Sequence, residues 1–314
     1  MGILDNMNNP SVLALGPALL GADINSPQAQ AAGITPPWPG FQGDVAQALR
    51  PWPQFTNLNF KSVPTGYSMY NSVTVKVEKR FSGGLIGRVA YTVSKLINNG
   101  SDDTLVGDGP GIQNPFLGQA DNRGLSRDDL PRSLILAWSY ELPFGKGKRF
   151  AGGASGPMDK LIGGWTLAAT QRYDAGRPLS IGMACDFCSY IFSNGKRPDR
   201  VGPGYGVRSN FDPNRDLYLV KSGWADPGPL QFGNASLHEP NVRSFPYHNE
   251  DISVNKDARI TERVGLRFET QLGNAFNRHL WCDPDTNWSS STFGEVFGQC
   301  DVPRKIQFGL RVEF

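Results

Sequence analysis

The sequence contains no long apolar run. No stretch approaches the roughly 18–20 consecutive apolar residues that a transmembrane helix needs, and the mean hydropathy is −0.36. A helix that spans a membrane is therefore excluded. A spanning β-strand is not excluded, because its residues alternate between two environments.

Net charge is also small. The 314 residues include 31 Lys and Arg and 29 Asp and Glu, which gives a net charge of +2, and charged residues make up only 19% of the chain. This balance gives no electrostatic reason to expect a nucleic-acid partner. Together with 37 Gly, 24 Pro and 11% aromatic residues, it argues against long amphipathic helices and predicts an all-β chain with long loops.

Catalytic motifs are missing. The three histidines, His238, His248 and His279, do not form an H-E-x-x-H zinc site. No G-x-S-x-G nucleophile motif occurs, and no pair of carboxylates stands out as a glycosidase site. We therefore predict that the protein is not an enzyme, and we assign no catalytic residue, metal ligand or cofactor.

A secretory signal is not evident at the start of the sequence. Such a signal begins with positive charge, but the first Lys or Arg is Arg50, and Asp5 lies near the start. Residues 1–69 are rich in Pro, Gly and Asn and lack sustained periodicity, so they are predicted to form an extended loop region. If the protein works outside the cytoplasm, we expect that this reading frame has lost its beginning.

Cysteine is rare, with four residues at Cys185, Cys188, Cys282 and Cys300. All four lie in stretches predicted to be loops, which suits two disulfides in an oxidising compartment. A zinc site is one alternative, because Cys185 and Cys188 have ligand spacing, but Cys282 and Cys300 are too far apart to form a second close pair. Free thiols are the other alternative.

From residue 69 onward, apolar and polar residues alternate with the period of a β-strand. Val73, Val75 and Val77, for example, are separated by Thr74 and Lys76. Seven strands are predicted, near residues 69–81, 85–94, 134–142, 165–181, 249–258, 264–272 and 305–314. One face of these strands is apolar. The charged side chains predicted on the opposite face are Lys76, Glu78, Arg88, Arg267, Glu269, Lys305 and Arg311.

The connections between these strands alternate in length. Long ones of about 35, 65 and 26 residues alternate with short ones of about 3, 18 and 5 residues, a layout typical of an outer-membrane barrel with short periplasmic turns and long outside loops. If residue 314 lies on the periplasmic side, all three long loops lie outside. Seven strands are an odd number, whereas single-chain bacterial barrels have an even number. We therefore expect the closing part of a larger barrel.

Several segments resemble TonB-dependent receptor barrels, and within them the Oar-like group. The resemblance covers residues 54–314. It rests on YNSVTVKVEKRF at 70–81, AYTVSK at 90–95, YELPFGKGK at 140–148, GGW at 163–165, GNAFN at 273–277 and RKIQFGL at 304–310.

The resemblance implies an antiparallel transmembrane β-barrel in the cell outer membrane, with residues 70–314 as its C-terminal part. It also implies ligand binding and uptake. Because the plug and the TonB box of full members are missing from the sequence, we expect the chain to be a truncated fragment of such a receptor. Expected partners are outer-membrane lipid, the barrel-assembly machinery, and the TonB system only if the full-length receptor exists. The tail resembles the barrel-assembly signal through Gln307, Gly309, Val312 and Phe314.

Aromatic residues in the predicted loops are candidates for stacking on a sugar or a siderophore. They are Tyr190, Phe192, Trp224, Trp281 and Trp288. Packing within the loops or a position at the membrane interface is the alternative for half or more of them. The alternative for the whole protein is a secreted or surface β protein that binds carbohydrate and has no membrane span.

Overall fold

The computed structural model describes residues 10–55, 66–99, 122–184, 196–207 and 209–314, and it confirms the predicted all-β fold. One antiparallel sheet of eight strands dominates the molecule, with the main order β1-β2-β4-β5-β8-β9-β10 and β3 paired to β2. The strands are β1 (Ser68–Ser82), β2 (Leu85–Asn98), β3 (Gly124–Leu125), β4 (Arg132–Glu141), β5 (Trp165–Asp174), β8 (Tyr247–Arg259), β9 (Gly265–Gly273) and β10 (Lys305–Glu313).

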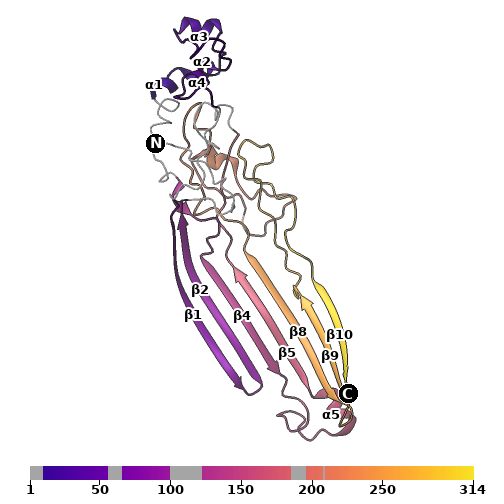
Figure 1. Ribbon diagram of the computed structural model, residues 1–314. Helices are drawn as coiled ribbons and strands as arrows, with labels where there is room; N and C mark the ends of the chain where they lie inside the picture. The colour runs from indigo at the N-terminus through magenta and orange to yellow at the C-terminus, as the bar shows by residue number, and fades with distance from the viewer. Residues whose placement is uncertain (1–9, 56–65, 100–121, 185–195, 208) are drawn as a thin grey trace.

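The sheet is open. Neighbours in sequence are neighbours in the sheet, so the main strands form a simple up-and-down meander (Figure 1). Within the described ranges, β1 and β10 each pair with one strand only, which leaves a free edge on each side. The barrel is therefore not closed by the described strands, as expected for part of a larger one.

The seven predicted strands are all present, with one clear difference in length. The fourth was expected to run as far as residue 181, but β5 ends at Asp174. Beyond it, Gly176 lies so close to the Ser244 carbonyl oxygen that an added Cβ would be 1.9 Å away, and Pro178 has no N–H to donate to a ladder. The chain therefore leaves the sheet there and enters the loops.

The two ends of the sheet differ as predicted. The short connections lie at one end, which we call the turn end, together with Phe314 and helix α5 (Gly156–Ile162) (Figure 1). The long connections lie at the opposite end, which we call the loop end. Among the residues described there, they form a two-stranded sheet of β6 (Asp199–Arg200) and β7 (Trp224–Ala225), and the 3₁₀-helix η3 (Lys221–Gly223).

The loop end contains a hydrophobic core of its own. Tyr218, Leu219 and Trp224 from the β5–β8 connection are buried against Phe293 and Val296 from the β9–β10 connection. The two long connections therefore pack into one structure, which we call the loop platform. The sequence predicted these connections as long loops, and this core was not predicted.

The prediction of an extended loop region over residues 1–69 was wrong for residues 10–55. Four short helices form there, α1 (Pro10–Leu13), α2 (Gly16–Leu20), α3 (Pro27–Ala31) and α4 (Val45–Ala48). The Ser26 and Asp44 side chains cap α3 and α4 by accepting hydrogen bonds from backbone N–H groups. Leu20, Ile24 and Val45 are fully buried in a cluster that also contacts Leu230 of the loop platform. Each helix is four or five residues long, too short to show a helical period in the sequence.

None of the helices in the described segments is both long enough and apolar enough to cross a membrane.

Candidate functional site

The sheet has two chemically different faces, and its register sets them. Residues directly opposite one another in neighbouring strands share a face. One such row crosses five strands through Trp138, Ala169, Ile252, Leu272 and Ile306. The adjacent row on the other face runs through Ala168, Ser253, Gln271 and Gln307. We call these the apolar face and the polar face.

The apolar face is uncovered at both edges of the sheet. Val73 on β1 and Phe308 on β10 are 70% and 67% exposed. The Phe268 and Phe308 rings lie across β9 and β10 with their centroids 6.2 Å apart. Other exposed residues of this face are Val75, Val77, Tyr91, Val93, Ile306, Leu310 and Val312. In water such a surface would be costly, because each buried CH₂ group contributes about 0.8 kcal/mol.

Charged residues on the apolar face lie toward its ends. Lys79 and Lys256 are near the turn end of β1 and β8. Lys95, Arg132 and Glu250 are near the loop end of β2, β4 and β8. The apolar residues therefore form a band with a polar boundary on both sides, as a sheet in a bilayer requires.

The charge of Glu250 is balanced by side chains that contact it directly. Its side chain is buried, and it accepts hydrogen bonds from the Tyr173 hydroxyl at 3.0 Å and from Arg278 Nη2 at 3.0 Å. Arg278 Nε donates to its second oxygen at 3.2 Å. Because Arg278 belongs to the β9–β10 connection, this cluster ties the loop platform to the sheet.

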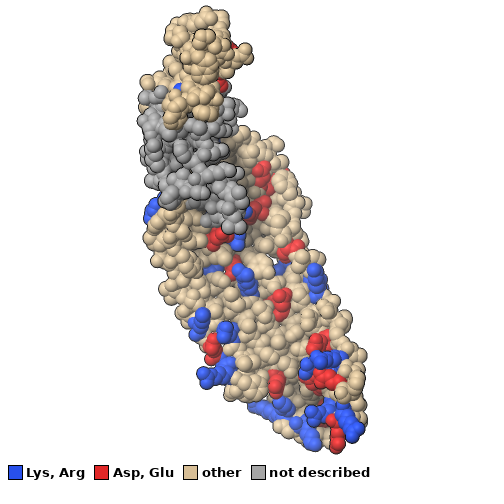
Figure 2. Space-filling view, in the orientation of Figure 1, with Lys and Arg blue, Asp and Glu red and all other residues tan. Residues whose placement is uncertain are grey.

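The polar face contains the charged residues that the sequence placed there. Glu78 and Arg88 face each other on β1 and β2 and form an ion pair at 2.9 Å. At the other side of the sheet, Arg267 pairs with Asp257 at 2.6 Å. Figure 2 shows acidic and basic side chains close together over the sheet. A hollow of about 890 Å³ follows this face, and most of its lining residues, from β1 across to β9, belong to it.

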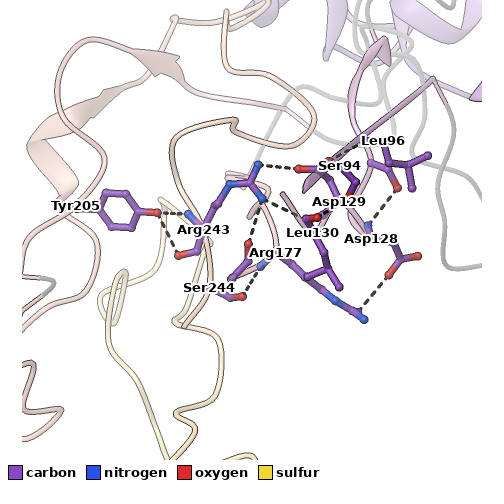
Figure 3. Close-up of polar contacts among 11 residues, drawn as sticks. Ser94, Leu96, Asp128, Asp129, Leu130, Arg177, Tyr205, Arg243 and Ser244 are labelled. Carbon is purple, nitrogen blue, oxygen red and sulfur yellow. Dashed lines mark hydrogen bonds and ion pairs between the residues drawn. The ribbon is translucent and has the colours of Figure 1, made fainter. Parts of the chain in front are cut away.

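A buried ion pair lies where the loop platform meets the sheet (Figure 3). Arg243 Nη2 is 2.7 Å from Asp129 Oδ2, and its Nη1 donates to the backbone oxygens of Asp129 and Gly176. Asp129 Oδ1 accepts from the Leu96 N–H of β2 at 2.7 Å. The Arg243 backbone oxygen accepts from the Tyr218 hydroxyl at 2.8 Å. This network fixes the long loops to the ends of β2 and β4.

The loop aromatics predicted to bind ligand lie in different environments. Trp224 is only 3% exposed and belongs to the core of the loop platform, which leaves it no face for a ligand. Trp281 and Trp288 are partly buried and pack against the same core. The Trp288 ring also lies 5.3 Å from Lys221 Nζ. Tyr190 and Phe192 lie outside the described residues.

A disulfide is formed between the two cysteines that lie in the described part of the chain. Cys282 and Cys300 are bonded across the β9–β10 connection. This pairing supports the disulfide interpretation for these two residues and excludes them as zinc ligands. Cys185 and Cys188 lie outside the described residues.

Acidic residues of the loop platform have shifted pKa values. The Lys196 ammonium donates to Asp226 Oδ1 at 2.8 Å and, with the Gly228 N–H, lowers the pKa of that carboxyl. Burial raises the pKa of Asp283, although Arg127 and Arg177 act in the opposite direction. The platform therefore contains carboxyl groups whose pKa values are shifted in opposite directions.

The residues of the predicted barrel-assembly signal all lie on or just after β10. Gln307 and Gly309 are on the polar face, Val312 is on the apolar face, and Phe314 is fully exposed at the turn end. Their placement is compatible with the signal and does not test it.

Asp129, Arg243 and Glu250 were not predicted from the sequence as structural centres. The first two sit in irregular segments, and their pairing depends on two distant loops meeting. One feature of the sequence could have identified Glu250: it is a charged residue on the apolar side of a predicted strand, and such a residue needs a partner.

Comparison with known proteins gives one finding. The family model described as "Outer membrane beta barrel domain" matches residues 16–307. Searches of the curated proteins and of the solved structures each found no match.

Proposed function

The chain belongs to the outer membrane beta barrel domain family, and from this we propose that it forms part of the wall of an outer-membrane receptor of the TonB-dependent, Oar-like type. In this role it binds and takes up a ligand and performs no catalysis. The observation that supports this proposal most directly is the contrast between the apolar face and the polar face of the sheet.

Each face suits one of the two environments of a barrel wall. The band of apolar residues faces lipid, and the polar face lines the interior, where the Glu78–Arg88 and Asp257–Arg267 pairs meet water or an inserted domain. The reverse orientation would place these charges in hydrocarbon, at a cost of about 2–4 kcal/mol for each Arg or Lys at the bilayer midplane.

A secreted carbohydrate-binding protein is the weaker alternative. A soluble sheet buries its apolar face against a second layer. Here Val73, Val75, Phe308 and Leu310 are all more than half exposed. Trp224, one of the loop aromatics predicted to bind a ligand, is buried in the core of the loop platform. It is therefore unavailable for stacking on a sugar.

The open sheet supports a larger barrel. The outer edges of β1 and β10 leave backbone N–H and C=O groups without a strand partner among the described residues. In hydrocarbon such groups must be paired. We propose that further strands complete the ring, with the loop platform forming part of the ligand entrance on the outside.

A pair of neighbouring substitutions on β10 tests the membrane orientation. Phe308→Arg places a charge on the apolar face, and Gln307→Arg places the same charge on the polar face. The full chain is mixed with lipid vesicles, and the fraction that stays bound after a urea wash is measured. We expect Phe308→Arg to lower this fraction strongly and Gln307→Arg to leave it nearly unchanged. Equal behaviour of the two variants would contradict the orientation.

The receptor type needs a different test. Translating the DNA upstream of Met1 in frame, with one frameshift or stop tolerated, should reveal a signal peptide, a carboxypeptidase-regulatory-like domain and a plug. An unrelated upstream gene would contradict the TonB-dependent part of the proposal and leave the family unchanged.

A further inference from the structure

The connection between β4 and β5 presents apolar side chains to solvent at the turn end of the sheet. Met158 and Leu161 of α5 are 59% and 67% exposed, and Phe144 and Phe150 are also exposed. Ile260, in the neighbouring β8–β9 turn, is exposed as well. We call these five residues the turn-end patch. A short periplasmic turn needs no such surface.

The patch is held in a fixed arrangement. The Trp165 indole N–H donates to the Leu161 oxygen at 3.0 Å, and Lys160 Nζ donates to the Ile260 oxygen at 2.8 Å. The Phe144 and Phe150 rings pack with centroids 5.6 Å apart. Gly145 approaches Gly163 so closely that an added Cβ would lie 2.7 Å from the Gly163 Cα. These contacts join α5 to the β8–β9 turn and hold the two ends of the β4–β5 connection together.

The patch continues the apolar face of the sheet. Trp165 begins β5 on that face, directly opposite Lys256 of β8. Lys256 Nζ lies 5.5 Å from the Trp165 ring centroid, and it donates to the Gly163 oxygen. A Trp and a Lys at the end of an apolar band are typical of the boundary between hydrocarbon and lipid headgroups.

Basic residues surround the patch. The connection carries Lys146, Lys148, Arg149 and Lys160 against a single acidic residue, Asp159. Lys148 forms an exposed ion pair with Glu141 at 3.1 Å. Figure 2 shows basic side chains at the turn end of the molecule, with acidic side chains among them. Exposed apolar residues with adjacent Lys and Arg characterise segments that lie on anionic membranes.

We propose that the turn-end patch is an interfacial anchor that lies in the headgroup region of the inner leaflet and binds anionic phospholipid. This rests on the proposed function, because the apolar face must lie in the same bilayer. Its apolar side chains enter the acyl boundary, and the basic residues contact lipid phosphates. The anchor sets the depth of the sheet in the membrane.

Site-specific labelling of the full chain tests the anchor. A fluorescent label is attached at Leu161→Cys and, in separate variants, at Phe308→Cys on the apolar face and at Val201→Cys, an exposed position at the loop end. Each variant is added to phosphatidylcholine vesicles with and without phosphatidylglycerol, with nitroxide quenchers carried by the lipid. The unsubstituted chain, labelled in parallel, corrects for reaction at native cysteines.

We expect severalfold stronger quenching at residues 161 and 308 than at residue 201. Phosphatidylglycerol should strengthen quenching at residue 161, and Lys146→Gln with Arg149→Gln should abolish that increase. Strong quenching at 308 with residue 161 equal to 201 would overturn the anchor alone. If quenching at residue 161 is the same with and without phosphatidylglycerol, the proposed binding of anionic phospholipid is overturned. Absence of quenching at 308 would overturn the proposed membrane orientation, and the anchor with it.

Discussion

Arg243 and Asp129 are 114 positions apart in the sequence, yet they form an ion pair of 2.7 Å at the loop end of the sheet. The Asp129 side chain is almost fully buried, and its other oxygen accepts from the Leu96 N–H of β2. One carboxylate therefore joins a strand to the longest loop. Long loops that are anchored in this way form one preformed surface rather than a set of independent loops.

Loss of this ion pair should loosen the loop platform. Arg243→Ala leaves the Asp129 carboxylate buried without its cation, and breaking a buried pair in this way costs about 3–5 kcal/mol. We expect faster amide hydrogen exchange at Leu96 and at Leu179, whose N–H donates to the Val242 oxygen. Arg215→Ala, which removes an exposed ion pair with Asp212, is the matched control. Similar exchange in both variants would show that the Arg243–Asp129 pair does not hold the loops.

The cluster around Glu250 makes a second prediction. Arg278→Ala removes two donors from a buried carboxylate, and we expect a loss of about 1–3 kcal/mol in the free energy of unfolding. Urea unfolding in lipid vesicles measures it. The double variant Glu250→Gln with Arg278→Ala should recover part of the loss, because the neutral amide needs no cation. A double variant less stable than Arg278→Ala alone would contradict this explanation.

The lowered pKa of Asp226 predicts a pH dependence at one loop. Its folded pKa is below the unfolded value, so its contribution to stability is fully present above the unfolded pKa of about 3.9. It is lost as the pH falls through the lower, folded value. We expect the protection factor of the Gly228 amide, which donates to Asp226, to fall at acid pH after correction for the intrinsic exchange rate. Asp226→Asn should remove this pH dependence, and a dependence that persists in the variant would assign it to another carboxyl.

The sequence by itself determined the strands, their two faces and the order of short and long connections. Val73, Val75 and Val77 show why: period-2 alternation is local, and a strand that lies between lipid and a polar interior must follow it along its whole length. The antiparallel order follows from the short turns. The face of Lys76, Glu78 and Arg88 needed no tertiary contact to be predicted.

Only the tertiary structure decided what the remaining residues do. Trp224 has the sequence context of an exposed loop aromatic, but it is buried because the β5–β8 and β9–β10 connections pack together, with Phe293 of the same core 69 positions further along the chain. The same meeting of distant segments produces the Arg243–Asp129 pair. Helices α1–α4 are too short for a periodic signal and are stabilised by their shared cluster. Alternation fixes a strand locally, whereas the core of an irregular loop depends on which distant side chains it meets.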